Sequence, residues 1–147
     1  MAQRAANHDL GHPALDEQHR HLLNLHFEAL DALRAGNRDG AVMTLLALEA
    51  AVGEHFAFEE ALMRDSGYPE RAMHEDAHRQ FGSDLAKLIA ALAEGASAAA
   101  TALWLDSRNG SWWRMHIRTN DASLARHLAL VPAPPPAARA EAAPPGP

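Results

Sequence analysis

The feature that most constrains the fold is a ligand-type pair of residues, four positions apart, on each of two successive apolar stretches. His55 and Glu59 form one pair, and His74 and His78 form the other. Residues at this spacing lie on one face of an α-helix. Both pairs interrupt stripes of Leu, Val and Phe that recur every three or four residues, as in helices packed in a bundle. The pairs are therefore expected to point into a helical core.

Two more segments add residues of the same kind. His19 and His26 lie on an earlier apolar stripe, whereas His116 and Asp121 are five positions apart. Five residues turn about 140° beyond a full helical turn, so this pair needs either a carboxylate that reaches sideways or a locally widened turn. Burying so many ionisable groups requires strong compensation, and a bound metal pair is the simplest form of it.

These patterns predict an all-α protein, an antiparallel up-down four-helix bundle. Asp16 is expected to cap the first helix, and Gly36, Gly67 and Gly95 are expected to end the first three. Residues 1–14 are assigned to an N-terminal arm and 15–130 to the bundle. The Pro/Ala-rich residues 131–147 are assigned to a disordered tail. The first three helices are expected over residues 16–35, 39–66 and 69–95.

The fourth helical segment is interrupted in the sequence. Asn109-Gly110 is a turn signal, and Ser111 is a possible helix cap. We expect either a kinked helix or a short helix, a break and a last helix.

Composition narrows the functional classes. The chain has 147 residues, about one domain, and its net charge is −6 with scattered basic residues, which disfavours a nucleic-acid partner. There is no N-terminal apolar segment and no apolar run of 18 residues, so we expect a cytoplasmic protein without membrane contact. Ten His and no Cys favour imidazole–carboxylate ligation of iron, manganese or zinc.

Two other metal sites compete with a shared core site. Residues 74–78 read HEDAH, which matches the HExxH motif of zinc hydrolases, with Glu75 as general base. That interpretation leaves the other pairs without a role and needs a substrate cleft. A ferritin-type di-iron site wants two Glu-x-x-His pairs, and only Glu75 with His78 fits.

The chain resembles the hemerythrin family, in particular bacterial single-domain hemerythrins. The matching segments are residues 11–19 (GHPALDEQH), residues 55–63 (HFAFEEALM), Tyr68-Pro69 with His74 and His78, and residues 112–121 (WWRMHIRTND). The resemblance covers residues 9–128. It also selects His19 over His26, because His19 follows Asp16 at the family's spacing.

The resemblance implies a non-haem centre of two Fe ions with an oxo or hydroxo bridge and one open position for O2. Three histidines would hold one iron, two would hold the other, and two carboxylates would bridge them. In that order, the ligands would be His74, His78 and His116; His19 and His55; and Glu59 and Asp121.

The implied function is reversible O2 binding for carriage, storage or delivery by a monomer, without enzymatic turnover. The alternatives are an oxygen or redox sensor that signals to a protein partner, a weak di-iron oxidase, and the zinc hydrolase. The family's apolar O2 pocket would correspond to Leu22, Phe56, Trp112 and Ile117.

Overall fold

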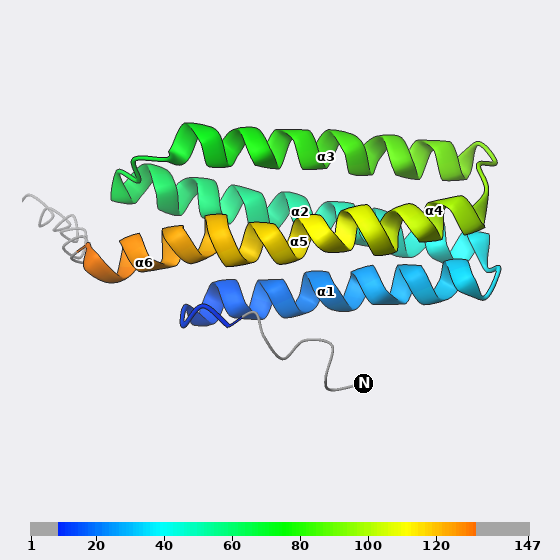
Figure 1. Ribbon diagram of the computed structural model, residues 1–147, viewed down its shortest axis with the longest axis horizontal. Helices are drawn as coiled ribbons and strands as arrows, with labels where there is room; N and C mark the ends of the chain where they lie inside the picture. The colour runs from blue at the N-terminus through cyan, green and yellow to red at the C-terminus, as the bar shows by residue number, and fades with distance from the viewer. Residues whose placement is uncertain (1–8, 132–147) are drawn as a thin grey trace, which may run out of the picture.

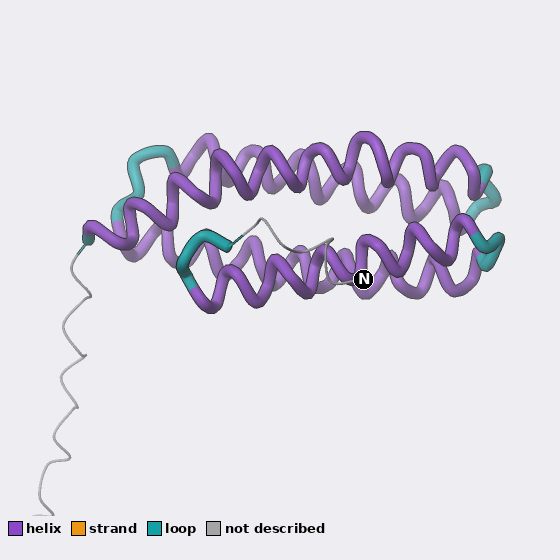
Figure 2. The backbone as a smooth tube through the Cα atoms, turned by 60° about the horizontal axis from the view of Figure 1, so that its bottom comes forward, coloured by secondary structure: helices purple, strands orange, loops and turns teal. Residues whose placement is uncertain are grey.

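The computed structural model describes residues 9–131, and these form four antiparallel helical rods without a strand. The first three rods are α1 (Pro13–Arg34), α2 (Arg38–Ser66) and α3 (Arg71–Ala93). Figures 1 and 2 show the rods side by side along their whole length, joined by short loops at the two ends. The all-α, up-down bundle expected from the apolar stripes is confirmed. Most of the expected arm and tail, at residues 1–8 and 132–147, lies outside the described residues.

The first helix begins earlier than expected, so the cap assigned to Asp16 is wrong. α1 starts at Pro13, whose fixed φ suits a first helical position. The ring of His12 accepts a hydrogen bond from the backbone N–H of Leu15 at 3.4 Å. The Asp16 carboxylate instead accepts hydrogen bonds from the backbone N–H groups of Leu10 and Gly11, at 2.7 and 3.2 Å. These bonds hold the preceding segment against α1.

The fourth rod is continuous, so the break at Asn109-Gly110, one of the two forms expected for this segment, is absent. Both residues have right-handed helical backbone angles, and Asn109 is buried. Two π-helical turns, each with a wider ring than an α-helical turn, are built into the rod. It runs through α4 (Ala98–Trp104), η1 (Leu105–Asn109), α5 (Gly110–His116), η2 (Ile117–Asp121) and α6 (Ala122–Leu130).

The apolar core has two unequal parts. A large cluster, which includes Leu45, Leu48 and Leu85, joins all four rods, and a small one contains Met63, Tyr68 and Leu124. α2 is long and apolar enough to cross a membrane by length and composition alone, but here it packs against α1 and α3 as a bundle helix. The buried histidines and carboxylates of the candidate site lie on these same core-facing surfaces.

Candidate metal centre

The seven side chains expected to form a metal site come together in the bundle interior. Every one of them is at most 3% exposed. One comes from α1, two from α2, two from α3, and two from the α5–η2 part of the fourth rod. In chain order they are His19, His55, Glu59, His74, His78, His116 and Asp121.

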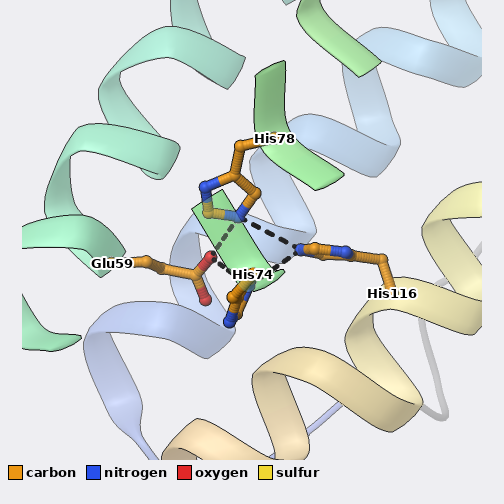
Figure 3. A group of neighbouring side chains, drawn as sticks. All are labelled: Glu59, His74, His78 and His116. Carbon is orange, nitrogen blue, oxygen red and sulfur yellow. Dashed lines mark hydrogen bonds and ion pairs between the residues drawn. The ribbon is translucent and has the colours of Figure 1, made fainter. Parts of the chain in front are cut away.

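The first donor group contains three histidines and one carboxylate. The Nε2 atoms of His74 and His78 lie 3.1 and 3.2 Å from Nε2 of His116. The Glu59 carboxylate completes the group, with Oε2 at 3.2 Å from His78 Nε2. Figure 3 shows these side chains converging from α2, α3 and α5 on one point. Ring nitrogens that face one another this closely are typical of ligands around a cation.

The second donor group has only two histidines and lies beside the first. His19 and His55 combine with Glu59 and Asp121, and one ligand atom of each lies within 4.8 Å of the others. Asp121 also links the groups, because its Oδ2 is 3.1 Å from His19 Nε2 while its Oδ1 is 3.1 Å from His74 Nε2. The two groups therefore have both carboxylates between them.

The π-helical turn η2 explains how His116 and Asp121 reach the same site. The turn begins directly after His116 and ends at Asp121. Its wider ring removes the angular offset of a five-residue spacing, and Asp121 Oδ1 lies 3.0 Å from His116 Nε2. Of the two expectations for this pair, the widened turn is the one found.

Several polar atoms of the cluster lack a hydrogen-bond partner among the described residues, and this shows whether the cluster suits a cation. His55 Nε2, both Glu59 oxygens and Asp121 Oδ1 are buried without a hydrogen-bond partner within residues 9–131. Buried polar atoms in native proteins are nearly always paired, and all these atoms are good metal donors. A five-imidazole, two-carboxylate donor set suits iron, manganese or zinc, so the residues fit a metal pair.

Two residues outside the expected set orient the ligands. The Nδ1–H of His55 donates to Gln18 Oε1 at 2.9 Å, and that of His78 donates to Glu60 Oε1 at 3.1 Å. These bonds fix the tautomer with a lone pair on Nε2, which faces the cluster. The sequence signal was present, since Gln18 and Glu60 directly adjoin His19 and Glu59, but helical spacing alone assigns adjacent residues to other faces.

The histidines of the metal-free cluster differ in pKa. Burial lowers the pKa of His55 to about 4. Burial also acts on His74, but its close contacts with the Asp121 and Glu59 carboxylates outweigh it and raise the pKa of His74 to about 9. Burial opposes ionisation of Asp121 as well, yet its contacts with His116, His19 and His74 hold the pKa of that carboxyl well below its usual range. Without metal, the cluster thus holds a proton on His74 between ionised carboxylates.

The expected O2-pocket residues are distributed unevenly around the cluster. Leu22, Phe56 and Ile117 are buried, and the Phe56 ring stacks on His78 with 3.8 Å between centroids. Trp112 is only half-buried and stacks on His116 at 4.2 Å. Trp113, which was not expected in the pocket, is 1% exposed and has its ring 6.2 Å from that of His55.

Two other candidate residues lie outside the cluster. Glu75, the general base of the hydrolase interpretation, forms a surface ion pair with Arg71 at 3.2 Å. His26 is buried, but its Nδ1 is bonded to Asn109 Oδ1 at 3.1 Å and it belongs to neither donor group. The geometry therefore favours the shared core site over an HExxH zinc site.

The fold and the site together define a helical-bundle protein with a buried cation-binding centre of histidines and carboxylates. A family model described as the hemerythrin HHE cation binding domain matches residues 10–128, most of the chain. The chain belongs to the hemerythrin family. No match was found among curated proteins.

Proposed function

We propose that this protein binds two iron ions in its two donor groups and uses them to bind O2 reversibly, as a carrier, store or local source rather than as an enzyme. The observation that carries the proposal is the inequality of the groups. His74, His78 and His116 belong to one, but only His19 and His55 to the other, and Glu59 is common to both. The second group therefore offers one imidazole fewer, and a metal held there would have a coordination position left for O2.

The side chains of the site cannot donate electrons to O2. A pair of ferrous ions would supply this chemistry, because together they can donate two electrons. The protein's part is to hold and orient. Glu59 and Asp121, from α2 and η2, lie between the two donor groups and would hold both metals. Gln18 and Glu60 keep the ring nitrogens of His55 and His78 pointing inward.

The apolar surroundings support binding over turnover. Leu22, Ile117 and Trp113 are each at most 1% exposed. An apolar shell limits the entry of water, protons and anions to a metal site. Restricted entry favours release of O2 unchanged over its loss with oxidation of the metal.

Iron quantitation combined with an absorption spectrum tests the proposal. Protein loaded with ferrous iron without air should retain about two iron ions per chain, one for each donor group. It should gain ultraviolet and visible charge-transfer bands in air and lose the visible band when O2 is removed. Zinc in place of iron, or bands that do not reverse, would contradict it.

Two variants separate this function from the hydrolase interpretation. His55→Ala removes one of the two imidazoles of the second group and should abolish O2 binding while the helices stay folded. Glu75→Gln changes only the surface ion pair with Arg71 and should leave O2 binding intact. Loss of function in Glu75→Gln but not in His55→Ala would favour a zinc hydrolase.

A further inference from the structure

A surface cleft lies next to the metal centre and has no role in the proposed function. It has a volume of about 360 Å³ and lies between the start of α3 and the η2–α6 part of the fourth rod. We call it the Tyr68 cleft. The lining residues that matter here are Tyr68, Glu70, His74, Arg118, Ser123 and Arg126.

The Tyr68 cleft carries positive charge on an acidic protein. Arg118 and Arg126 are exposed, and neither pairs with a carboxylate within residues 9–131, although the chain has a net charge of −6. The one acidic group of the lining, Glu70, accepts a hydrogen bond from the Tyr68 hydroxyl at 3.0 Å. The cleft thus offers two free guanidinium groups, which bind oxyanions well.

The rest of the fourth rod does not neutralise this charge. Residues 98–130 contain Asp106 and Asp121 as their only acidic residues. Asp106 is paired with Arg34 at 2.9 Å, and Asp121 is buried in the metal centre. The fourth rod therefore offers no free carboxylate that could pair with Arg118 or Arg126.

A buried donor at the cleft lacks an acceptor. His74 is 1% exposed and lines the cleft, while its Nε2 faces Glu59, Asp121 and His116. Its Nδ1 has no hydrogen-bond partner among the described residues, and Figure 3 shows this side of the ring turned away from Glu59 and His116.

The matching atoms of two other ligand-type histidines are satisfied. His55 Nδ1 has Gln18, and His78 Nδ1 has Glu60. Metal-ligating histidines almost always donate their second ring N–H to an acceptor. Within the described part of the chain, His74 and His19 are thus left without the contact that His55 and His78 have, and of these two only His74 lines the cleft.

We propose that the Tyr68 cleft binds a small oxyanion, either phosphate or a carboxylate. The guanidinium groups of Arg118 and Arg126 donate to it, and it lies beside the side chain of His74, which lines the same cleft. Only the effect on the metal rests on the proposed function. The anion site itself depends on residues that are present with or without iron.

Calorimetric titration of the iron-loaded protein with inorganic phosphate tests the site, with acetate and potassium chloride as parallel titrants. We expect saturable binding of phosphate, of acetate, or of both, and the stronger of the two identifies the anion class. Arg118→Gln and Arg126→Gln should each weaken that binding about tenfold. Arg108→Gln, an equal change of charge at an exposed position of the same rod, should not.

The absorption spectrum, recorded in the same titration, tests the contact with His74. A change in the iron bands with the same midpoint as the heat supports anion binding beside this ligand. No saturable heat, an equal response to chloride, or equal weakening by Arg108→Gln would overturn the site. An unchanged spectrum of the iron-loaded protein would overturn the placement of the anion beside His74. If the protein holds no iron, the calorimetric arm on the metal-free protein still decides whether the cleft binds an oxyanion.

Discussion

At the scale of single residues, His74 and His55 differ most sharply in protonation. Carboxylate contacts raise the pKa of His74 to about 9 against the effect of burial, and burial lowers that of His55 to about 4. Metal binding requires both imidazoles to be neutral. At neutral pH, His55 is already neutral, whereas His74 must lose its proton before it can bind a metal.

We therefore expect uptake of ferrous iron at pH 7 to release about one proton per chain, and metal affinity to rise with pH until about pH 9. The protons can be counted with an indicator dye in weak buffer without air. The same experiment above pH 9 is the control, because His74 is then already neutral and little proton should appear. Release that did not depend on pH would contradict this assignment of the proton.

Glu60 acts on the metal only through His78. Glu60→Ala removes the acceptor of the His78 Nδ1–H, and loss of such a contact typically lowers metal affinity about 10–100-fold. Glu60→Gln retains an acceptor oxygen, so its metal affinity should fall much less than that of Glu60→Ala. Glu54→Ala, at an exposed position of the same helix, controls for the charge. Metal affinity, measured by competition with a chelator, should rank Glu54→Ala first and Glu60→Ala last.

At the scale of elements, the sequence predicts three rods well and the fourth poorly. Stripes such as Leu45, Leu48 and Val52 report burial directly, and Gly67, with φ of 65°, ends α2 where expected. Asn109-Gly110 favours a turn by local preference, but the fold overrides it, because Asn109 bonds to buried His26 from a distant helix. Such long-range contacts are not visible in local spacing.

The same limit applies to the site. The pairs at helical spacing indicated four of the seven converging residues, and the family resemblance selected His19, His116 and Asp121, whereas Gln18, Glu60 and Trp113 were missed. They follow from how the helices rotate against one another, which depends on packing. The π-helical turn η2 shows the intermediate case, since the five-residue spacing of His116 and Asp121 left a widened turn as one of two possibilities.

The bond between His26 and Asn109 should stabilise η1 in the fourth rod. Burial lowers the pKa of His26, which favours the neutral ring that donates Nδ1–H to Asn109 Oδ1. Asn109→Ala leaves this buried donor unpaired and should lower the free energy of unfolding by about 1–3 kcal/mol. Urea denaturation measures the change. Arg108→Ala, exposed on the same turn, should stay within about 0.5 kcal/mol of the parent, and equal losses in both variants would contradict the role of the bond.

At the scale of the whole molecule, metal binding and folding are coupled through the bundle core. Ligand-type residues from all four rods meet at one place, so unfolding disperses the whole donor set. A ligand that binds only the folded state stabilises it by about 2.7 kcal/mol when its free concentration is about 100 times Kd. For a chain of this size that corresponds to roughly 10 °C in Tm. Removal of metal should therefore lower Tm without changing the fold.

The size of this effect should depend on pH in a definite direction. In the metal-free protein the raised pKa of His74 contributes stability below about pH 6.5, and that stability is lost as pH rises towards about 9. The lowered pKa of His55 acts on the acid side, where stability is lost as pH falls from about 6.5 towards 4.

Bound metal keeps His74 neutral at all these pH values, so the metal-loaded protein does not lose stability as the pH rises towards 9. The difference in Tm between metal-loaded and chelator-treated protein should widen from about pH 6.5 to about pH 9. Thermal unfolding without air over this range measures it, and a difference that stayed constant or narrowed would show that His74 does not hold the proton of the metal-free core.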